Sequence, residues 1–263
     1  MRRRGAGDHT RRMSQKTARR ARVQSPPSVG ADRGVPRAWL YGGAGLLAVI
    51  VVVAVVLASQ LGGDGEAAPA PGAAATSSAL LAGIPQDGAS LGSPEAPVTL
   101  VEYADLQCPF CAEWSRDAFG PLVEEYVRGG KLRIEFRGLA FIGPDSTTAL
   151  RAAVAAGEQD RLWNVVHDLY ASQGGENEGW VTEDLLRGIL AGAGLDAEAV
   201  LGSLDSDAVT QGIAAAAAAA EASGIDRTPT FQLGPTGGTL ELLQVETLDA
   251  DAFRPSIDGL LGG

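Results

Sequence analysis

The chain has few residues that bind soft metals: two cysteines, two histidines and two methionines among 263 residues. Cys108 and Cys111 supply only half of the four ligands that a structural zinc site needs. A copper carrier is disfavoured because both methionines, Met1 and Met13, lie in the N-terminal tail. Lysine is equally scarce while alanine and glycine abound, which indicates a GC-rich bacterial genome. We therefore expect no metal cofactor, and attention turns to the cysteine pair.

The two cysteines form the motif Cys108-Pro109-Phe110-Cys111 directly after an apolar, strand-like run at residues 98–103. Cysteines at i and i+3 across a helix start can close a small disulfide ring, and the first then faces unpaired N–H groups that favour a thiolate. A purely structural disulfide would close a loop of only four residues and stabilise the fold by roughly 2 kcal/mol. The motif predicts a redox-active dithiol, with metal binding and inert thiols as alternatives.

Residues 38–61 are predicted to form a transmembrane helix. No charged residue occurs over the 26 positions from Ala38 to Gly63, and about 20 apolar residues cross the hydrocarbon core. Trp39 and Tyr41 lie at the start of this run, where interfacial aromatic side chains are favoured. No cysteine lies between the run and Cys108, which excludes a lipoprotein anchor. A retained anchor is favoured by the long basic segment before it, with a cleaved signal peptide as the alternative.

Charge predicts the orientation of that helix. Residues 1–37 carry eleven Lys/Arg against two Asp/Glu, whereas the rest of the chain carries ten against thirty. The positive-inside rule makes residues 1–37 a disordered cytoplasmic tail and sends the remainder outward, where disulfides persist. The arginine clusters contain no interleaved aromatic residues, so we expect no nucleic-acid binding.

Beyond the membrane, composition separates a linker from a single domain. Residues 62–91 are rich in Ala, Pro, Gly and Ser and predict a semi-flexible linker, because such a segment buries little apolar surface. Residues 92–263 are long enough for one domain. Its predicted elements are a strand at 98–103, a helix at 108–129 kinked at Gly120-Pro121, a strand at 131–137, helices within 145–223, a hairpin at 230–243 and a helix at 249–261.

This order resembles the thioredoxin superfamily, and more narrowly the DsbA-like thiol:disulfide oxidoreductases. The resemblance covers about Gly92 to Leu261. It implies an α/β thioredoxin-like fold with an inserted helical subdomain at about 145–223, preceded by a single transmembrane helix. It rests on the strand before the cysteines, the Cys-Pro-Phe-Cys motif, the helix with Trp163 and His167-Asp168-Leu169-Tyr170, and Gly224-Ile225-Asp226-Arg227-Thr228-Pro229-Thr230-Phe231.

The resemblance also implies roles for individual residues. Cys108 matches the exposed nucleophile and Cys111 the buried resolving thiol. Thr228-Pro229 matches a loop whose proline is cis, with the Thr228 backbone pairing with substrate; a trans proline opening a strand is the alternative. Pro109 and Phe110 complete the expected substrate surface. The strongest oxidants of the family carry histidine between the cysteines, so Phe110 predicts a less oxidising protein.

Glu102, His167 and Trp114 are three further residues with an expected place in the fold. Glu102 matches a buried acid of the family, for which we expect a proton relay to Cys111; a solvent-facing strand residue is the alternative. His167 shares a polar helix face with Asn164 and Asp168, so exposure at the surface is expected rather than a site role. Trp114 is expected to pack in or near the core.

We therefore expect an extracytoplasmic, membrane-anchored enzyme that oxidises cysteines of exported proteins through a Cys108–Cys111 disulfide, without another cofactor. The expected partners are reduced or unfolded exported proteins and, by family resemblance, a quinone-linked membrane reoxidase. No dimerisation segment is evident, which favours a monomer. A reductase or isomerase fed by a membrane electron donor is one alternative. A non-catalytic domain that binds a metal or a partner is another.

Overall fold

The structure, a computed structural model, describes residues 77–262. These residues belong to one compact unit, Asp64–Gly263. The predicted tail at 1–37, the predicted transmembrane helix at 38–61 and the first part of the predicted linker lie outside the described residues. Within residues 77–262, no helix combines the length and apolar character that a membrane crossing requires.

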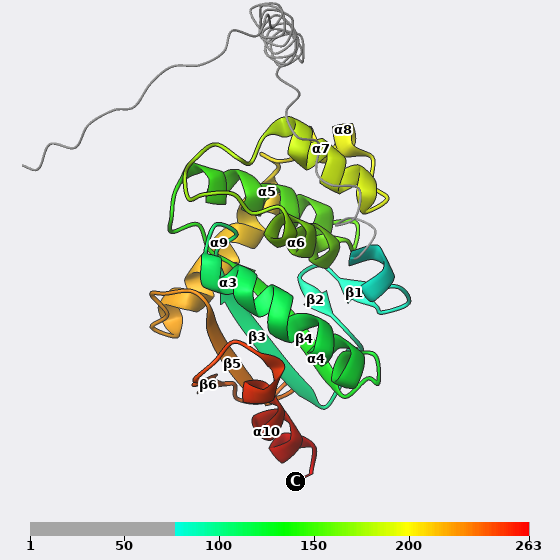
Figure 1. Cartoon of the computed structure of the whole chain (residues 1–263), viewed down its shortest axis with the longest axis vertical. Helices are drawn as coiled ribbons and strands as arrows, with labels where there is room; N and C mark the ends of the chain where they lie inside the picture. The colour runs from blue at the N-terminus through cyan, green and yellow to red at the C-terminus, as the bar shows by residue number, and fades with distance from the viewer. Residues whose placement is uncertain (1–76, 263) are drawn as a thin grey trace, which may run out of the picture. The chain divides into compact units, whose positions relative to one another are not determined.

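A six-stranded sheet with the order β1-β2-β4-β3-β5-β6 forms the centre of the fold (Figure 1). β3 pairs in parallel with β4, so that these two strands and the helix between them form a βαβ unit, and antiparallel with β5. All seven residues of β3 are buried, as expected for a central strand covered on both faces. The strands are β1 (Gln86–Asp87), β2 (Ser90–Leu91), β3 (Val98–Ala104), β4 (Leu132–Gly138), β5 (Thr230–Pro235) and β6 (Glu241–Leu243).

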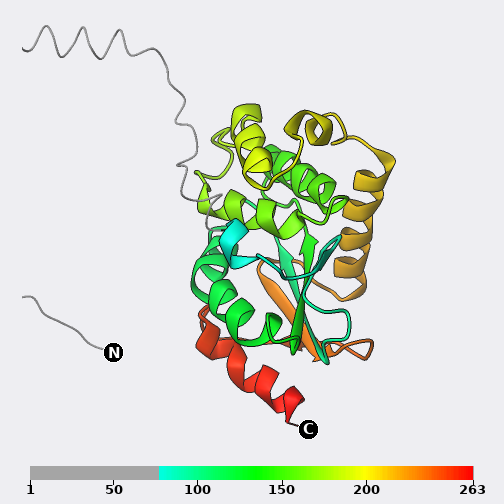
Figure 2. The same cartoon turned by 90° about the vertical axis from the view of Figure 1, so that its right-hand side faces the viewer.

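The helix after the cysteines, for which a kink at Gly120-Pro121 was predicted, is irregular on both sides of this pair. It comprises α3 (Pro109–Trp114) and α4 (Gly120–Leu122), with π-helical segments at Ser115–Phe119 and Val123–Val127. Pro121 has no N–H group, so the regular ladder of hydrogen bonds is interrupted there. This helix and α10 (Ala250–Leu261) lie on one side of the sheet, and α9 (Asp207–Ala222) lies on the other (Figure 2).

The predicted helical insertion is confirmed between β4 and β5. Its first four helices gather at one end of the sheet, and α9 returns the chain along the sheet to β5 (Figure 1). Side-chain caps fix several of the helix starts: the Thr182 hydroxyl accepts from Leu185 N–H at the start of α7. The helices before α9 are α5 (Pro144–Gly157), α6 (Leu162–Ala171), α7 (Glu183–Gly192) and α8 (Ala197–Leu201).

Trp114 lies in the core, as expected for its position one turn after Cys111. Its ring is 1 % exposed and lies 5.6 Å from Phe119, 5.4 Å from Phe231 and 6.3 Å from Phe253, measured between ring centroids. These rings come from the helix that follows the cysteines, from β5 and from α10. The aromatic cluster therefore ties the helix that carries both cysteines to the C-terminal half of the fold.

Residues 77–91 differ from the predicted linker, because they belong to the folded unit. Residues 77–80 are helical, and β1 and β2 form a hairpin that pairs with the edge of β4. Leu81, Ile84 and Leu91 are buried in the main core. A few apolar residues between Gly, Ser and Pro are sufficient to fold this segment onto the domain, because the edge of β4 offers both hydrogen bonds and an apolar surface.

The same segment covers the face of α6 that was predicted to be exposed. Ser77 Oγ donates to Asp168 Oδ2, and Gln86 Nε2 donates to Asn164 Oδ1, both at 2.8 Å. Asn164 and Asp168 are buried, and the His167 side chain is only 18 % exposed, with its ring against Phe119. The predicted surface position of this face is wrong, because polar groups of residues 77–91 cover it.

Candidate active site

The two cysteines lie at the start of α3, immediately beyond the loop that follows β3. Cys108 is the N-cap residue with an extended backbone (φ −70°, ψ 120°), and Pro109 begins the helix. Proline suits that position because its missing N–H has no partner in the helix anyway. Cys108 is 4 % exposed and Cys111 is fully buried, and both are free thiols. Cys108 is thus less exposed than expected.

Cys108 is covered by the loop before β5. The Thr228–Pro229 peptide bond is cis, which confirms that prediction. The Cys108 Sγ lies 3.4 Å from the Thr228 carbonyl oxygen, to which the thiol donates. The fold therefore brings together the cysteine motif and a loop 120 positions later in the chain.

The surroundings of the two sulfurs give them opposite proton affinities. A hydrogen bond from the Cys111 thiol, helped by Thr228 and by the backbone N–H groups of Cys111 and Phe110, lowers the pKa of Cys108 to about 6 despite partial burial. Burial raises the pKa of Cys111 well above its usual range, and the neighbouring Cys108 and Glu102 add to this rise. At neutral pH the pair therefore holds a Cys108 thiolate and a Cys111 thiol.

Glu102 lies within β3 beneath the cysteines and is fully buried. Neither of its carboxyl oxygens has a hydrogen-bond partner among the described residues. Burial raises the pKa of this carboxyl well above its usual range, and the negative charge of Cys108 raises it further. The alternative of a solvent-facing glutamate is wrong. A buried carboxyl that holds its proton more tightly than usual and interacts electrostatically with both cysteines is able to hold and return a proton.

A polar network behind the active-site loop was missed by the sequence analysis. One oxygen of the buried Asp105 accepts from Gln107 N–H at 2.8 Å and from the Ser146 hydroxyl at 2.6 Å. The other accepts from the N–H groups of Phe141 and Ile142, at 2.7 and 3.1 Å. The sequence offered only one signal for this network, an acidic residue three positions before Cys108. The more distant partners of Asp105 come from the loop after β4 and from α5.

The helical subdomain contacts the same loop from α6. The Tyr170 hydroxyl donates to the Asp105 carbonyl at 3.3 Å. The Gln173 side-chain amide donates to the carbonyls of Leu106 and Cys108, at 2.9 and 3.2 Å. No residue pattern in the sequence predicts these bonds, because they depend on how the inserted helices pack against the thioredoxin-like part.

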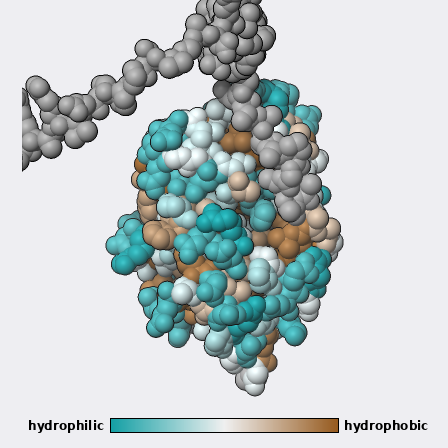
Figure 3. All heavy atoms as spheres, in the orientation of Figure 1, coloured by the Kyte–Doolittle hydropathy of each residue, from teal (hydrophilic) through white to brown (hydrophobic). Residues whose placement is uncertain are grey.

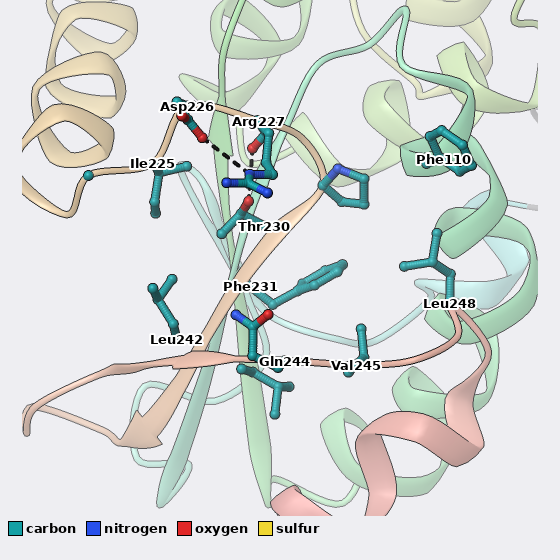
Figure 4. Close-up of a pocket in the computed structure, with 13 residues that line it drawn as sticks. Phe110, Ile225, Asp226, Arg227, Thr230, Phe231, Leu242, Gln244, Val245 and Leu248 are labelled. Atoms are coloured by element: carbon teal, nitrogen blue, oxygen red, sulfur yellow. Dashed lines mark hydrogen bonds and ion pairs between the residues drawn. The ribbon is translucent and has the colours of Figure 1, made fainter. Parts of the chain in front are cut away.

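A groove of about 330 Å³ borders the site between the cysteine motif and the β5–β6 hairpin. It extends from Phe110 and Leu248 toward Ile225 and Leu242, with Phe231 between them (Figure 4). Phe110 is 59 % exposed at one end. On the face shown in Figure 3, hydrophobic residues gather in several separate patches. The groove is lined by these apolar side chains and by polar ones, among them Asp226, Arg227, Thr230 and Gln244.

The dithiol lies at a helix start and faces the residue before a cis-proline. The helix belongs to a βαβ unit, and a β-hairpin continues the same sheet. These features define a dithiol protein of the thioredoxin fold. The family model described as thioredoxin matches residues 86–238, more than half of the chain. The chain therefore belongs to the thioredoxin family.

Individual relatives confirm the resemblance to the DsbA-like group. The chain is 39 % identical over 103 residues to a probable disulfide bond formation protein D of Bacillus anthracis, a match that covers 38 % of this chain and 48 % of that protein. The chain thus spans about half the length of this curated relative. BdbD of Bacillus subtilis has a similar fold (TM-score 0.59, 23 % identity, covering 68 % of this chain and 98 % of BdbD). So does alpha-DsbA1 of Wolbachia pipientis (TM-score 0.58, 23 % identity, covering 66 % and 90 %).

The different states of the two thiols predict a selective, pH-dependent alkylation. In the reduced chain, iodoacetamide should modify Cys108 with a rate that is half-maximal near pH 6, since only the thiolate reacts. Cys111 should stay unmodified over the same range because its sulfur is buried. Peptide mapping at each pH distinguishes the two sites.

The Cys111→Ala variant serves as the control, because it removes the main hydrogen bond to the Cys108 sulfur. Its alkylation profile should move to higher pH. A wild-type midpoint near the ordinary thiol value of about 8.5 would contradict the assigned electrostatics.

Proposed function

We propose that this chain is a thiol–disulfide oxidoreductase that oxidises cysteines of exported proteins through a Cys108–Cys111 disulfide. The observation that carries the proposal is the asymmetric pair: the pKa of Cys108 is lowered to about 6, whereas that of Cys111 is raised. A stabilised thiolate favours the reduced form of the protein, which makes its disulfide a better oxidant. The name of the Bacillus anthracis relative, a disulfide bond formation protein, supports the same activity.

The proposed reaction proceeds by two exchanges. A substrate thiolate attacks Cys108 Sγ, the Cys108–Cys111 bond breaks, and its electron pair passes to Cys111. A second substrate thiolate then attacks the substrate sulfur of the mixed disulfide and expels Cys108 as a thiolate. The substrate loses two electrons and forms a disulfide, while the protein gains them as a dithiol. The low pKa of Cys108 makes it the better leaving group in the second exchange.

Substrate is proposed to bind across the Thr228–Pro229 loop and the exposed side of the cysteine motif. A peptide in extended conformation would pair with the Thr228 backbone, beside the Cys108 sulfur. Pro109 and Phe110 would form the other wall, and apolar side chains next to the substrate cysteine would enter the adjoining groove. Recognition led by the backbone is compatible with many substrate sequences.

Glu102 is proposed to exchange a proton with Cys111. When Cys111 leaves the disulfide, its sulfur becomes a buried anion, which is costly unless a proton is supplied. The electrostatic effect of Glu102 on the pKa of Cys111 supports this role, as does the absence of a hydrogen-bond partner for the carboxyl among residues 77–262.

We propose an extracytoplasmic location, with the chain anchored by residues 38–61, and reoxidation by a quinone-linked membrane partner. Support comes from the charge difference across the apolar segment and from the DsbA-like relatives. One observation favours a second candidate, a reductase of the same fold. The side chain of Phe110 offers neither a positive charge nor an imidazole to the Cys108 thiolate, which lowers the oxidising power.

Replacement of either cysteine should abolish turnover, but the two variants should differ in whether they form a mixed disulfide. With a reduced two-cysteine peptide and oxidised glutathione, both Cys108→Ala and Cys111→Ala should lose all turnover above the uncatalysed rate, measured by mass spectrometry of the peptide. Cys111→Ala should still form a long-lived mixed disulfide with an aromatic disulfide reagent, because no resolving thiol remains. Cys108→Ala should form one far more slowly, since Cys111 is buried. Wild-type turnover that survives in Cys108→Ala would contradict the mechanism.

Replacing Glu102 with its neutral isostere tests the proton relay. Glu102→Gln should slow the formation of the mixed disulfide from the oxidised protein by about a hundredfold at neutral pH, the lower end of general acid–base effects. Glu135→Gln, on the neighbouring strand but partly exposed and paired with Arg133, should keep the wild-type rate. Stopped-flow tryptophan fluorescence provides the readout. Equal rates in wild type and Glu102→Gln would exclude the relay.

A further inference from the structure

The loop that carries Cys108 lacks the usual support at a helix start. An N-cap residue normally uses its own side chain to bond the first N–H groups of the helix. At α3 the N-cap residue is Cys108, and within residues 77–262 no side-chain capping bond forms there. Its side chain is the reacting sulfur, so another group has to fix the backbone. Pro109 adds no N–H donor to help.

Gln173 supplies this support from the helical subdomain. Its Nε2 group donates to the carbonyl of Leu106 at 2.9 Å and to the carbonyl of Cys108 at 3.2 Å. The Cys108 carbonyl also accepts the first helical bond, from Ala112 N–H at 3.2 Å. One amide group thus joins the loop to the helix start, on both sides of Gln107.

The anchor of Gln173 is rigid. It follows directly after α6, whose residues Leu169 and Tyr170 are buried in the core, and Tyr170 bonds the same loop at the Asp105 carbonyl. Asp105 in turn accepts the Cys108 N–H at 2.9 Å. The backbone of Cys108 is therefore held at its N–H by the loop and at its carbonyl by Gln173.

We infer that Gln173 is a positioning residue that holds Cys108 in register with the N–H groups of α3 and thereby sets the redox equilibrium of the dithiol. The thiolate depends on its alignment with the N–H groups of Phe110 and Cys111 and with the side chain of Thr228. A shift of the Cys108 backbone weakens all of these contacts together. The inference rests on the proposed redox function and extends it to the inserted helices.

The test uses the full chain in mild detergent, equilibrated with reduced and oxidised glutathione. Gln173→Leu removes both hydrogen bonds, and Gln173→Glu keeps the shape of the side chain but replaces the donor with an acceptor. Loss of thiolate stabilisation disfavours the dithiol, so the equilibrium constant for forming the protein disulfide should rise by about threefold to tenfold, the range of one hydrogen bond. The midpoint of Cys108 alkylation should move to higher pH in parallel.

Gln86→Leu is the matched control. Gln86 is also a half-buried glutamine that makes two hydrogen bonds to α6, to Trp163 N–H and to Asn164, but it does not contact the active-site loop. This variant should lose thermal stability while its glutathione equilibrium stays at the wild-type value.

The outcomes separate the inference from the proposed function. A wild-type chain that forms no disulfide with glutathione would overturn the proposed function itself. In another outcome, the wild-type chain forms and loses its disulfide with glutathione, and Gln173→Glu is folded by circular dichroism but has an unchanged equilibrium constant and alkylation midpoint. This outcome would overturn only the role of Gln173. An equal shift in Gln86→Leu would also overturn it, since a general loosening of α6 would then explain the effect.

Discussion

The structure depends on how the Cys108 sulfur is held at the first turn of α3. Three contacts meet there: the Cys111 thiol one turn along the helix, the backbone N–H groups of that turn, and the Thr228 side chain from the loop before β5. Together they lower the pKa of Cys108 to about 6, so this sulfur is a thiolate at neutral pH. The parallel pair β3–β4 and the inserted helices both serve to keep this geometry in place.

Burial makes the pKa values of the two thiols different, which gives the two cysteines different roles in thiol–disulfide exchange. Cys111 and Glu102 are removed from water, and both hold their protons more tightly than usual. Cys108 is therefore ready to leave or attack as a thiolate, while Cys111 holds its proton. The core that encloses them is completed by the aromatic rings around Trp114, which join the active-site helix to β5 and α10.

Local signals in the sequence were sufficient for the central strand, the cysteine motif, the hairpin and the closing helix, which begins at its Asp249 cap. The cis-proline and the burial of Glu102 followed from the family resemblance. The position of residues 77–91 did not follow, because the composition of that segment conceals the three apolar residues that enter the core. The error on the polar face of α6 has the same cause, since that segment covers it. The network of Asp105, Gln107 and Gln173 depends on tertiary packing and leaves no pattern in the sequence.

The measurement that tests the account most directly is the reduction potential of the full chain, titrated against glutathione. A thiolate stabilised at Cys108 predicts an oxidant with a potential of about −120 to −180 mV, with Phe110 favouring the more reducing end. A potential near about −270 mV, the range of thioredoxin, would contradict the assignment as an oxidase and indicate a reductase that draws electrons from the membrane.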